Sequence, residues 1–194
     1  MSNIHEVIWK KFGIKLRDNL PHRAWEGHRQ HLAQVFNEVG FKSGAEVGVR
    51  KGEFSLVLCQ SIPGLKLLSI DPWTPYVKAN EQKQKEYYEI TVKTLAPYNA
   101  EIIKKTSMEA VKDVPDGSLD FVYIDGLHDF DSVIMDILEW NKKVKRGGII
   151  SGDDFIHGYQ IGVMFAVEAY TRAHNINPWY LTNDREPTWF WVKP

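Results

Sequence analysis

The chain has 194 residues, of which 43% are hydrophobic and 12% aromatic, which is enough to bury one sizeable core. Its formal net charge of −1 gives no general attraction to nucleic acid or to anionic membranes, so we predict neither as a partner. No apolar run approaches the roughly 20 residues that span a bilayer, and the start lacks a signal pattern, which predicts a soluble cytoplasmic protein.

Hydrophobic periodicity divides the chain into a helical N-terminal segment, residues 1–42, and a domain over residues 43–194. Pro21 interrupts the helical segment and Gly40 ends it. In the domain, short apolar runs predict strands at 45–49, 65–71, 101–105, 119–125 and 147–152. Helices are predicted at 53–61, 79–96, 130–143 and 160–173, and two aromatic strands at 178–181 and 188–192.

Strands that alternate with helices, each an almost continuous apolar run, predict a doubly wound α/β fold with a mostly parallel sheet covered on both faces. The last two strands are joined only by the short polar stretch 182–187, so we expect them to form an antiparallel hairpin at one edge. In such sheets, ligands bind beyond the carboxyl ends of the strands.

Acidic residues are concentrated at the ends of the predicted strands, although strand interiors disfavour aspartate. The first strand carries Glu46 and the second ends at Asp71. The fourth strand ends at Asp125, and the fifth is followed by Asp153 and Asp154. We therefore expect a functional site at this rim of the sheet.

The stretch Ala45–Gly52 predicts a buried strand that turns sharply into a helix, and such a turn leaves backbone N–H groups facing a crevice. Gly48 and Gly52 would let the backbone approach a ligand, while Asp71 would accept hydrogen bonds from ribose hydroxyls. The spacing Gly48-Val-Arg-Lys-Gly52 is not the Gly-x-Gly-x-x-Gly of dinucleotide sites. The turn therefore favours a nucleoside without a pyrophosphate.

Four segments in this order resemble the motifs of class I S-adenosylmethionine-dependent methyltransferases, over about residues 43–155. They are Glu46-x-Gly48-x-x-x-Gly52, Asp71-Pro-Trp73, Thr106-Ser-Met108 and Asp120-Phe-Val-Tyr-Ile-Asp-Gly-Leu-His128. The Ile-Asp-Gly-x-His segment, followed by Gly-Gly-Ile-Ile-Ser-Gly-Asp-Asp, resembles the small cation-dependent O-methyltransferases that act on catechol-like or sugar hydroxyls. The resemblance implies a Rossmann-like, seven-stranded sheet with a reversed last strand.

The same resemblance implies which residues contact S-adenosylmethionine. The methionine part would be bounded by Glu46, Gly48, Val49 and Gly52, and the ribose would be held by Asp71, with Pro72 beside it. Trp73 would lie near the adenine or the entrance, and Ser107 and Met108 would border the adenine. Asp125 is expected at the cofactor as well.

The carboxylates of Asp125, Asp153 and Asp154 would repel one another if they converged at neighbouring strand ends, and a hard cation such as Mg²⁺ relieves such repulsion. Residues 153 and 154 point to opposite faces in a regular strand, so both can bind one cation only if the chain bends after Gly152. The alternative is that Asp154 caps the following segment and no metal binds.

His128 lies three residues past Asp125, within reach of a substrate placed over the cofactor's methyl group. Its ordinary pKa of about 6.5 suits a general base, so we predict His128 and Asp125 as the catalytic residues. The predicted reaction moves the sulfonium methyl to a hydroxyl of a small-molecule acceptor.

Two other functions stay open. A nicotinamide-dependent oxidoreductase would need a pyrophosphate turn that the sequence lacks, and a binding or sensor module would retain the nucleoside pocket without catalysis. The N-terminal segment is expected either to cover the cofactor or to mediate homodimer contact, and the sequence does not choose between these roles.

Overall fold

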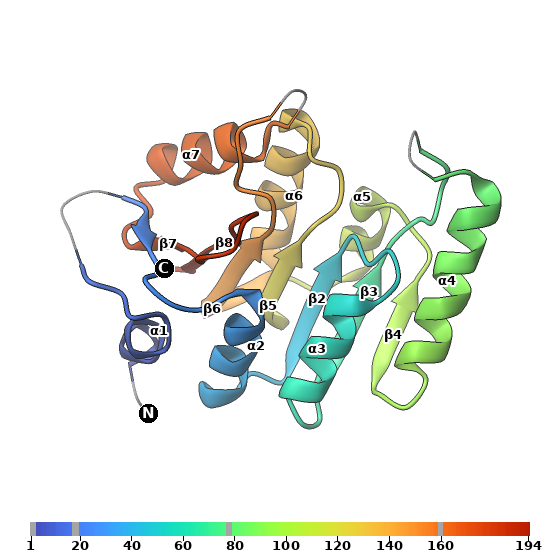
Figure 1. Cartoon of the computed structure of the whole chain (residues 1–194), viewed down its shortest axis with the longest axis horizontal. Coiled ribbons are helices and arrows are strands. Elements are labelled where there is room, and N and C mark those ends of the chain that lie inside the picture. Colours follow the sequence, from blue (N-terminus) through green and yellow to red (C-terminus); the bar gives the residue numbers. More distant parts are fainter. Residues whose placement is uncertain (1–2, 17–19, 77–78, 159–160) are drawn as a thin grey trace.

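An eight-stranded sheet runs through the molecule and is covered by helices on both faces (Figure 1). The computed structural model describes residues 3–16, 20–76, 79–158 and 161–194. The strand order is β1-β7-β8-β6-β5-β2-β3-β4. The strands are β1 (His22–Arg23), β2 (Ser43–Val47), β3 (Lys66–Ile70), β4 (Ala100–Ile103), β5 (Leu119–Ile124), β6 (Val144–Gly152), β7 (Trp179–Leu181) and β8 (Trp189–Val192).

The predicted α/β architecture is confirmed. Strand β8 is antiparallel to both β6 and β7, and the other pairings are parallel, so the C-terminal hairpin and the reversed strand are as expected. The predicted count of seven strands is one too few. The additional strand, β1, has two residues that directly follow Pro21, and it pairs in parallel with β7 at the sheet edge.

The helices are α1 (Ile4–Phe12), α2 (Arg29–Glu38), α3 (Glu53–Ser61), α4 (Glu81–Leu95), α5 (Ser107–Ala110), α6 (Phe130–Lys143) and α7 (Val163–Ala173). A 3₁₀ turn, η1 (Val111–Asp113), follows α5. The last helix starts at Val163, later than predicted, and residue 160, where we placed its start, lies outside the described residues. None of the helices in the described ranges is long and apolar enough to cross a membrane.

Side chains that alternate along the strands supply two separate cores. On β5, Phe121 and Tyr123 pack with α1, α2 and α3 on one face, while Val122 and Ile124 pack with α6 and α7 on the other. The N-terminal helices contribute buried residues such as Phe12 and Leu32 to the first of these cores. Residues 1–42 thus include two helices packed on the sheet, and their role as a cover or a dimer contact remains a prediction.

Candidate functional site

The carboxyl ends of β2, β3, β5 and β6 meet at one rim of the sheet, where we expected the site. Backbone hydrogen bonds continue past the strand ends: the N–H of Gly48 donates to Ile70 O at 2.8 Å, and the N–H of Asp125 donates to Val47 O at 2.7 Å. The N–H of Asp153 donates to Ile124 O at 3.0 Å. The predicted acidic positions therefore follow neighbouring strands at the same rim.

The turn after β2 can lie directly against the end of β5 because Gly48 has no side chain. This residue has a φ of +91°, and a Cβ built on it would lie 1.9 Å from the carbonyl oxygen of Asp125. Gly52, with a φ of +77°, is the N-cap residue before α3 and forms no side-chain cap. The two glycines thus permit the close backbone approach that the sequence predicts.

Asp71 fixes the conformation of this turn. Its Oδ2 accepts the N–H groups of Val49 at 3.1 Å and Arg50 at 2.9 Å, and its Oδ1 accepts the N–H of Trp73 at 2.7 Å. Pro72, between Asp71 and Trp73 in the sequence, is partly buried. The structure therefore shows a structural role for Asp71 beside the turn, and its contact with a ribose remains a prediction.

Trp73 is buried, and its place near the adenine or the entrance remains a prediction. Its ring packs in a small cluster with Val49 and Tyr87, its edge faces Tyr88, and its Nε1 donates to Arg50 O at 2.8 Å. The backbone of Trp73 is left-handed, with a φ of +46°. Trp73 thus supports the turn from the side of α4.

Glu46 lies beneath α3 with only 2% of its surface exposed. Its carboxyl accepts a short hydrogen bond from the hydroxyl of Ser55, which is 2.9 Å from the hydroxyl of Ser69. Burial raises the pKa of Glu46 to about 8, although the Ser55 hydrogen bond acts in the opposite direction. Burial thus favours the protonated form of Glu46, and its predicted contact with a methionine group stays untested.

Ser107 and Met108 lie at the start of α5, which Thr106 caps. The Ser107 hydroxyl donates a short hydrogen bond to Asp136 Oδ1 and accepts one from Trp140 Nε1 at 2.8 Å. Met108 packs against the core on the α6 face. Burial raises the pKa of Asp136 to about 6. We did not predict Asp136, although its place on the buried stripe of α6 between Val133 and Trp140 could have indicated it.

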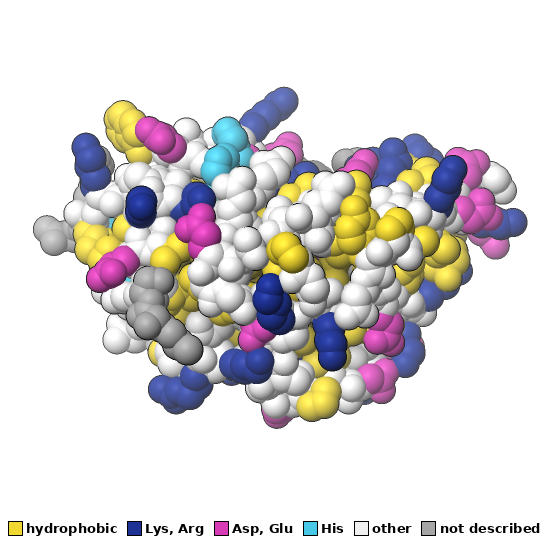
Figure 2. All heavy atoms as spheres, turned by 90° about the horizontal axis from the view of Figure 1, so that it is seen from below, with side chains coloured by type: hydrophobic (Ala, Val, Ile, Leu, Met, Phe, Trp, Pro, Cys, Tyr) yellow, Lys and Arg dark blue, Asp and Glu magenta, His cyan; other side chains and the backbone are white. Residues whose placement is uncertain are grey.

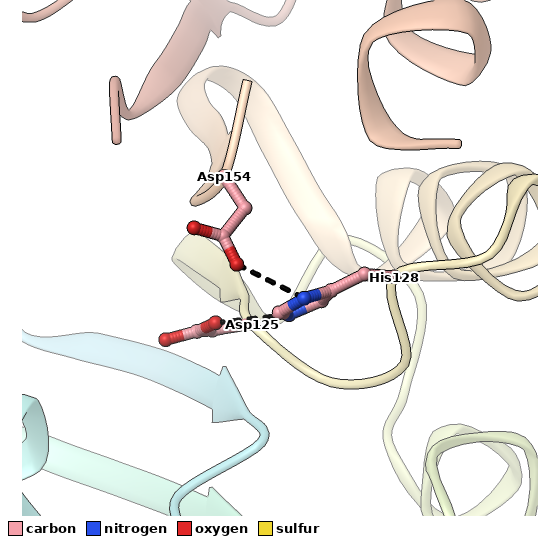
Figure 3. Close-up of side chains that lie close together, drawn as sticks. All are labelled: Asp125, His128 and Asp154. Atoms are coloured by element: carbon pink, nitrogen blue, oxygen red, sulfur yellow. Dashed lines mark ion pairs between the residues drawn. The ribbon is translucent and has the colours of Figure 1, made fainter. Parts of the chain in front are cut away.

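Asp125, His128 and Asp154 form the main charged group of the rim (Figure 3). One ligand atom from each lies within 4.8 Å of those of the others. His128 Nδ1 is 2.9 Å from Asp154 Oδ2, and its Nε2 is 3.4 Å from Asp125 Oδ1. Asp154 has a φ of +58°, so the chain bends where β6 ends.

The two carboxylates determine the charge of the imidazole. Asp125 and Asp154 together raise the pKa of His128 to about 10, so His128 is protonated at neutral pH. Burial raises the pKa of Asp125 although His128 stabilises its ionised form. In this state His128 is a hydrogen-bond donor and cannot accept a proton.

Asp153 does not belong to this group; it lies just past the end of β6, and the chain bends at the next residue, Asp154. The Oδ2 of Asp153 forms an ion pair with Arg29 Nη1 at 2.7 Å, and its Oδ1 accepts the Thr188 hydroxyl at 3.0 Å. The group found in the described residues therefore contains two of the three predicted carboxylates, and His128 stands in place of Asp153. Arg29, the first residue of α2, was missed because one arginine on an amphipathic helix carries no distinguishing signal.

This group has the chemistry of a cation site. Two carboxylates meet at one point, and the imidazolium of His128 supplies the positive charge that offsets them. Carboxylate oxygens suit hard cations such as Mg²⁺, whereas a histidine nitrogen as a third donor would suit Mn²⁺ or Zn²⁺. His128 Nε2, 3.4 Å from Asp125 Oδ1, makes no well-formed hydrogen bond among the described residues, and it could bind a cation only after losing its proton. The residues thus fit a divalent cation.

Comparison with known proteins gives two kinds of similarity. A family model described as a methyltransferase domain matches residues 45–155. A protein of Sinorhizobium fredii, described as uncharacterized protein y4gI, is 23% identical over 149 residues. That match covers 74% of this chain and 16% of the y4gI protein, so the chain spans about a sixth of that relative's length.

Several solved structures share the fold. A putative caffeoyl-CoA O-methyltransferase from Staphylococcus aureus has a TM-score of 0.66 at 16% identity, with 100% of this chain and 93% of that chain covered. An O-methyltransferase from Bacillus cereus in complex with SAH scores 0.64 at 16% identity, with 100% and 91% covered. TomG from Streptomyces achromogenes, in complex with SAM, scores 0.64 at 14% identity, with 99% and 97% covered.

Proposed function

The chain belongs to this family of methyltransferase domains, and we propose that it transfers a methyl group from S-adenosylmethionine to a hydroxyl of a small molecule. The O-methyltransferases of similar fold, two of them in complex with SAH or SAM, support the choice of cofactor and of an oxygen acceptor. They do not favour an oxidoreductase or a module without catalysis.

One observation carries the proposal: the backbone of Gly48 abuts the backbone of Asp125. The glycine turn and the Asp125–His128–Asp154 group are thereby held at one rim, beyond the ends of neighbouring parallel strands. A ligand at the turn would have its reactive end beside the charged group. S-adenosylmethionine supplies an electrophilic methyl group, so the chain has to bind it, align an acceptor oxygen and receive the acceptor's proton.

We further propose that Asp125 and Asp154 hold a divalent cation and that His128 is then the general base. The cation would supply the positive charge that lowers the pKa of an acceptor hydroxyl. In the structure the imidazolium occupies that electrostatic role, which keeps its pKa near 10. When a divalent cation balances the charges of Asp125 and Asp154, the pKa of His128 would return toward its ordinary value, and a ring nitrogen could then accept a proton.

The first test of this proposal is binding of S-adenosylhomocysteine, with NAD as the competing ligand. At a concentration of 100 times Kd, a ligand that binds only the native state adds about 2.7 kcal/mol to its stability. For a chain of this size that corresponds to a rise in Tm of roughly 5–10 °C. A rise with S-adenosylhomocysteine and none with NAD is expected, and the reverse pattern would contradict the proposal.

The second test separates catalysis from binding. Small hydroxylated compounds are screened for a mass gain of one methyl group, with added Mg²⁺ and with EDTA. The His128→Asn variant should lower kcat about 10²–10⁴-fold, as the loss of a general base does, and leave the Kd for S-adenosylhomocysteine unchanged. His157→Asn, in the exposed loop after β6, is the matched control and should be neutral. If Kd worsens as much as kcat falls, His128 is not the base.

A further inference from the structure

Three cationic side chains gather around the ring of Tyr87 on α4. The guanidinium carbon of Arg50 lies 5.4 Å from the ring centroid, Lys51 Nζ lies 5.1 Å from it, and Lys83 Nζ lies 5.8 Å from it. Arg50 and Lys51 belong to the turn between β2 and α3, and Lys83 belongs to the first turn of α4. Two elements thus bring three positive charges to one place.

The turn that carries Arg50 and Lys51 is rigidly held. Asp71 accepts the N–H of Arg50, while the carbonyl of Arg50 accepts Trp73 Nε1 at 2.8 Å and the Thr91 hydroxyl at 3.2 Å. The backbone of Arg50 is left-handed, with a φ of +54°. A ligand would therefore meet cations whose backbone is already fixed, which lowers the entropy cost of binding.

The positive charge of this cluster is not neutralised by acids. Within the described ranges, none of Arg50, Lys51 and Lys83 forms a salt bridge, and Glu53 acts on Arg50 only from a distance. Although burial acts to raise it, the pKa of Tyr87 is lowered by the neighbouring Arg50 and Lys83. Cations held together without an acid form a site that attracts a multiply charged anion.

We propose that Arg50, Lys51 and Lys83 form a binding site for the phosphoryl group of a small molecule. Phosphate matches this set because it carries more than one negative charge, and because arginine can bind it through two parallel hydrogen bonds. The site lies on the same turn as Gly48, and nothing in the proposed methyl transfer uses these three side chains.

A small phosphorylated molecule fits the cluster better than nucleic acid does. Nucleic-acid-binding proteins present an extended basic stripe, whereas this cluster contains three residues of a chain with a net charge of −1. On the face seen from below in Figure 2, lysine, arginine and acidic side chains are interspersed. The cluster itself holds three cationic side chains, and its size suits one phosphoryl or pyrophosphoryl group.

The test is calorimetric titration of the full chain with inorganic pyrophosphate at low ionic strength. The double variant Lys51→Gln/Lys83→Gln should weaken binding by about tenfold or more, because it removes two of the three charges. The double variant Lys85→Gln/Lys93→Gln removes the same charge from exposed positions of the same helix and should bind as the wild type does. Equal weakening in both double variants, or no binding by the wild type, would overturn the proposal.

A second arm separates this site from the cofactor site. Pyrophosphate should still bind in the presence of saturating S-adenosylhomocysteine. If S-adenosylhomocysteine abolishes pyrophosphate binding, the cluster holds the carboxylate of the cofactor and the inference fails while the proposed methyl transfer stands. If pyrophosphate binds and S-adenosylhomocysteine does not, the phosphoryl site stands and the proposed function fails.

Discussion

Replacing Gly48 with alanine tests the close approach on which the site depends. A non-glycine residue at a φ of +91° costs about 1–2 kcal/mol in the left-handed region. The added Cβ would also meet the carbonyl oxygen of Asp125 at 1.9 Å, and forcing such an overlap apart costs typically about 1–3 kcal/mol. The Gly48→Ala variant should therefore lose about 2–5 kcal/mol of unfolding free energy.

The matched control is Gly64→Ala. Gly64 has a φ of +75°, but no atom lies within 4 Å of a Cβ built on it, so only the backbone cost applies. Urea denaturation of both variants gives the overlap cost as a difference of about 1–3 kcal/mol. Gly48→Ala should also weaken S-adenosylhomocysteine binding, and Gly64→Ala should not. Equal losses of stability in the two variants would refute the argument that the turn is pressed against β5.

Three further predictions concern charged groups. The pKa of His128, followed by NMR, should lie well above 6.5 and should fall in Asp154→Asn. Because the folded-state pKa is raised to about 10, the stability that His128 contributes is complete below pH 6.5 and is lost as the pH rises through about 10. Titration of His128 near 6.5 in the wild type would contradict the proposed cluster. The folded-state pKa of Glu46 is raised from 4.5 to about 8, so its contribution to stability is present below pH 4.5 and is lost as the pH rises to about 8. Urea midpoints should therefore show the wild type losing stability relative to Glu46→Gln over that range. A stability difference between the two proteins that does not change with pH would show that Glu46 is ionised. Arg29→Gln should cost about 2–4 kcal/mol of unfolding free energy because it leaves the buried carboxylate of Asp153 without its cation. The control Lys145→Gln, which breaks the more exposed ion pair with Asp120, should cost less than about 1 kcal/mol. Equal costs in the two variants would show that Asp153 does not depend on Arg29.

The sequence predicted those parts of the fold that depend on local pattern. Continuous apolar runs located the central strands, and the acids that follow them, Asp71 and Asp125, lie at one rim because parallel strands share their direction. The family assigned from the ordered motifs is confirmed by the match over residues 45–155. Strand β1 could not be predicted, because two residues have no periodicity and their pairing with β7 depends on the tertiary fold.

The site was predicted less completely than the fold, for reasons of side-chain direction and electrostatics. The sequence placed Asp153 and Asp154 together, but only the left-handed bend at Asp154 decides which of them reaches His128. The pairing of Asp153 with Arg29 joins the N-terminal segment to β6, and no spacing in the sequence indicates it. Helix α5 did have a signal, the capping box of Thr106 and Glu109, which our prediction did not use.

A crystal structure with S-adenosylhomocysteine is the most direct test of the central claim. We predict that the ligand lies at the rim formed by β2, β3 and β5, with its ribose hydroxyls on Asp71 and its methionine part against the turn at Gly48. Its sulfur should then face the Asp125–His128–Asp154 group. Electron density for the ligand at another part of the molecule, or a sulfur that faces away from His128, would contradict the account.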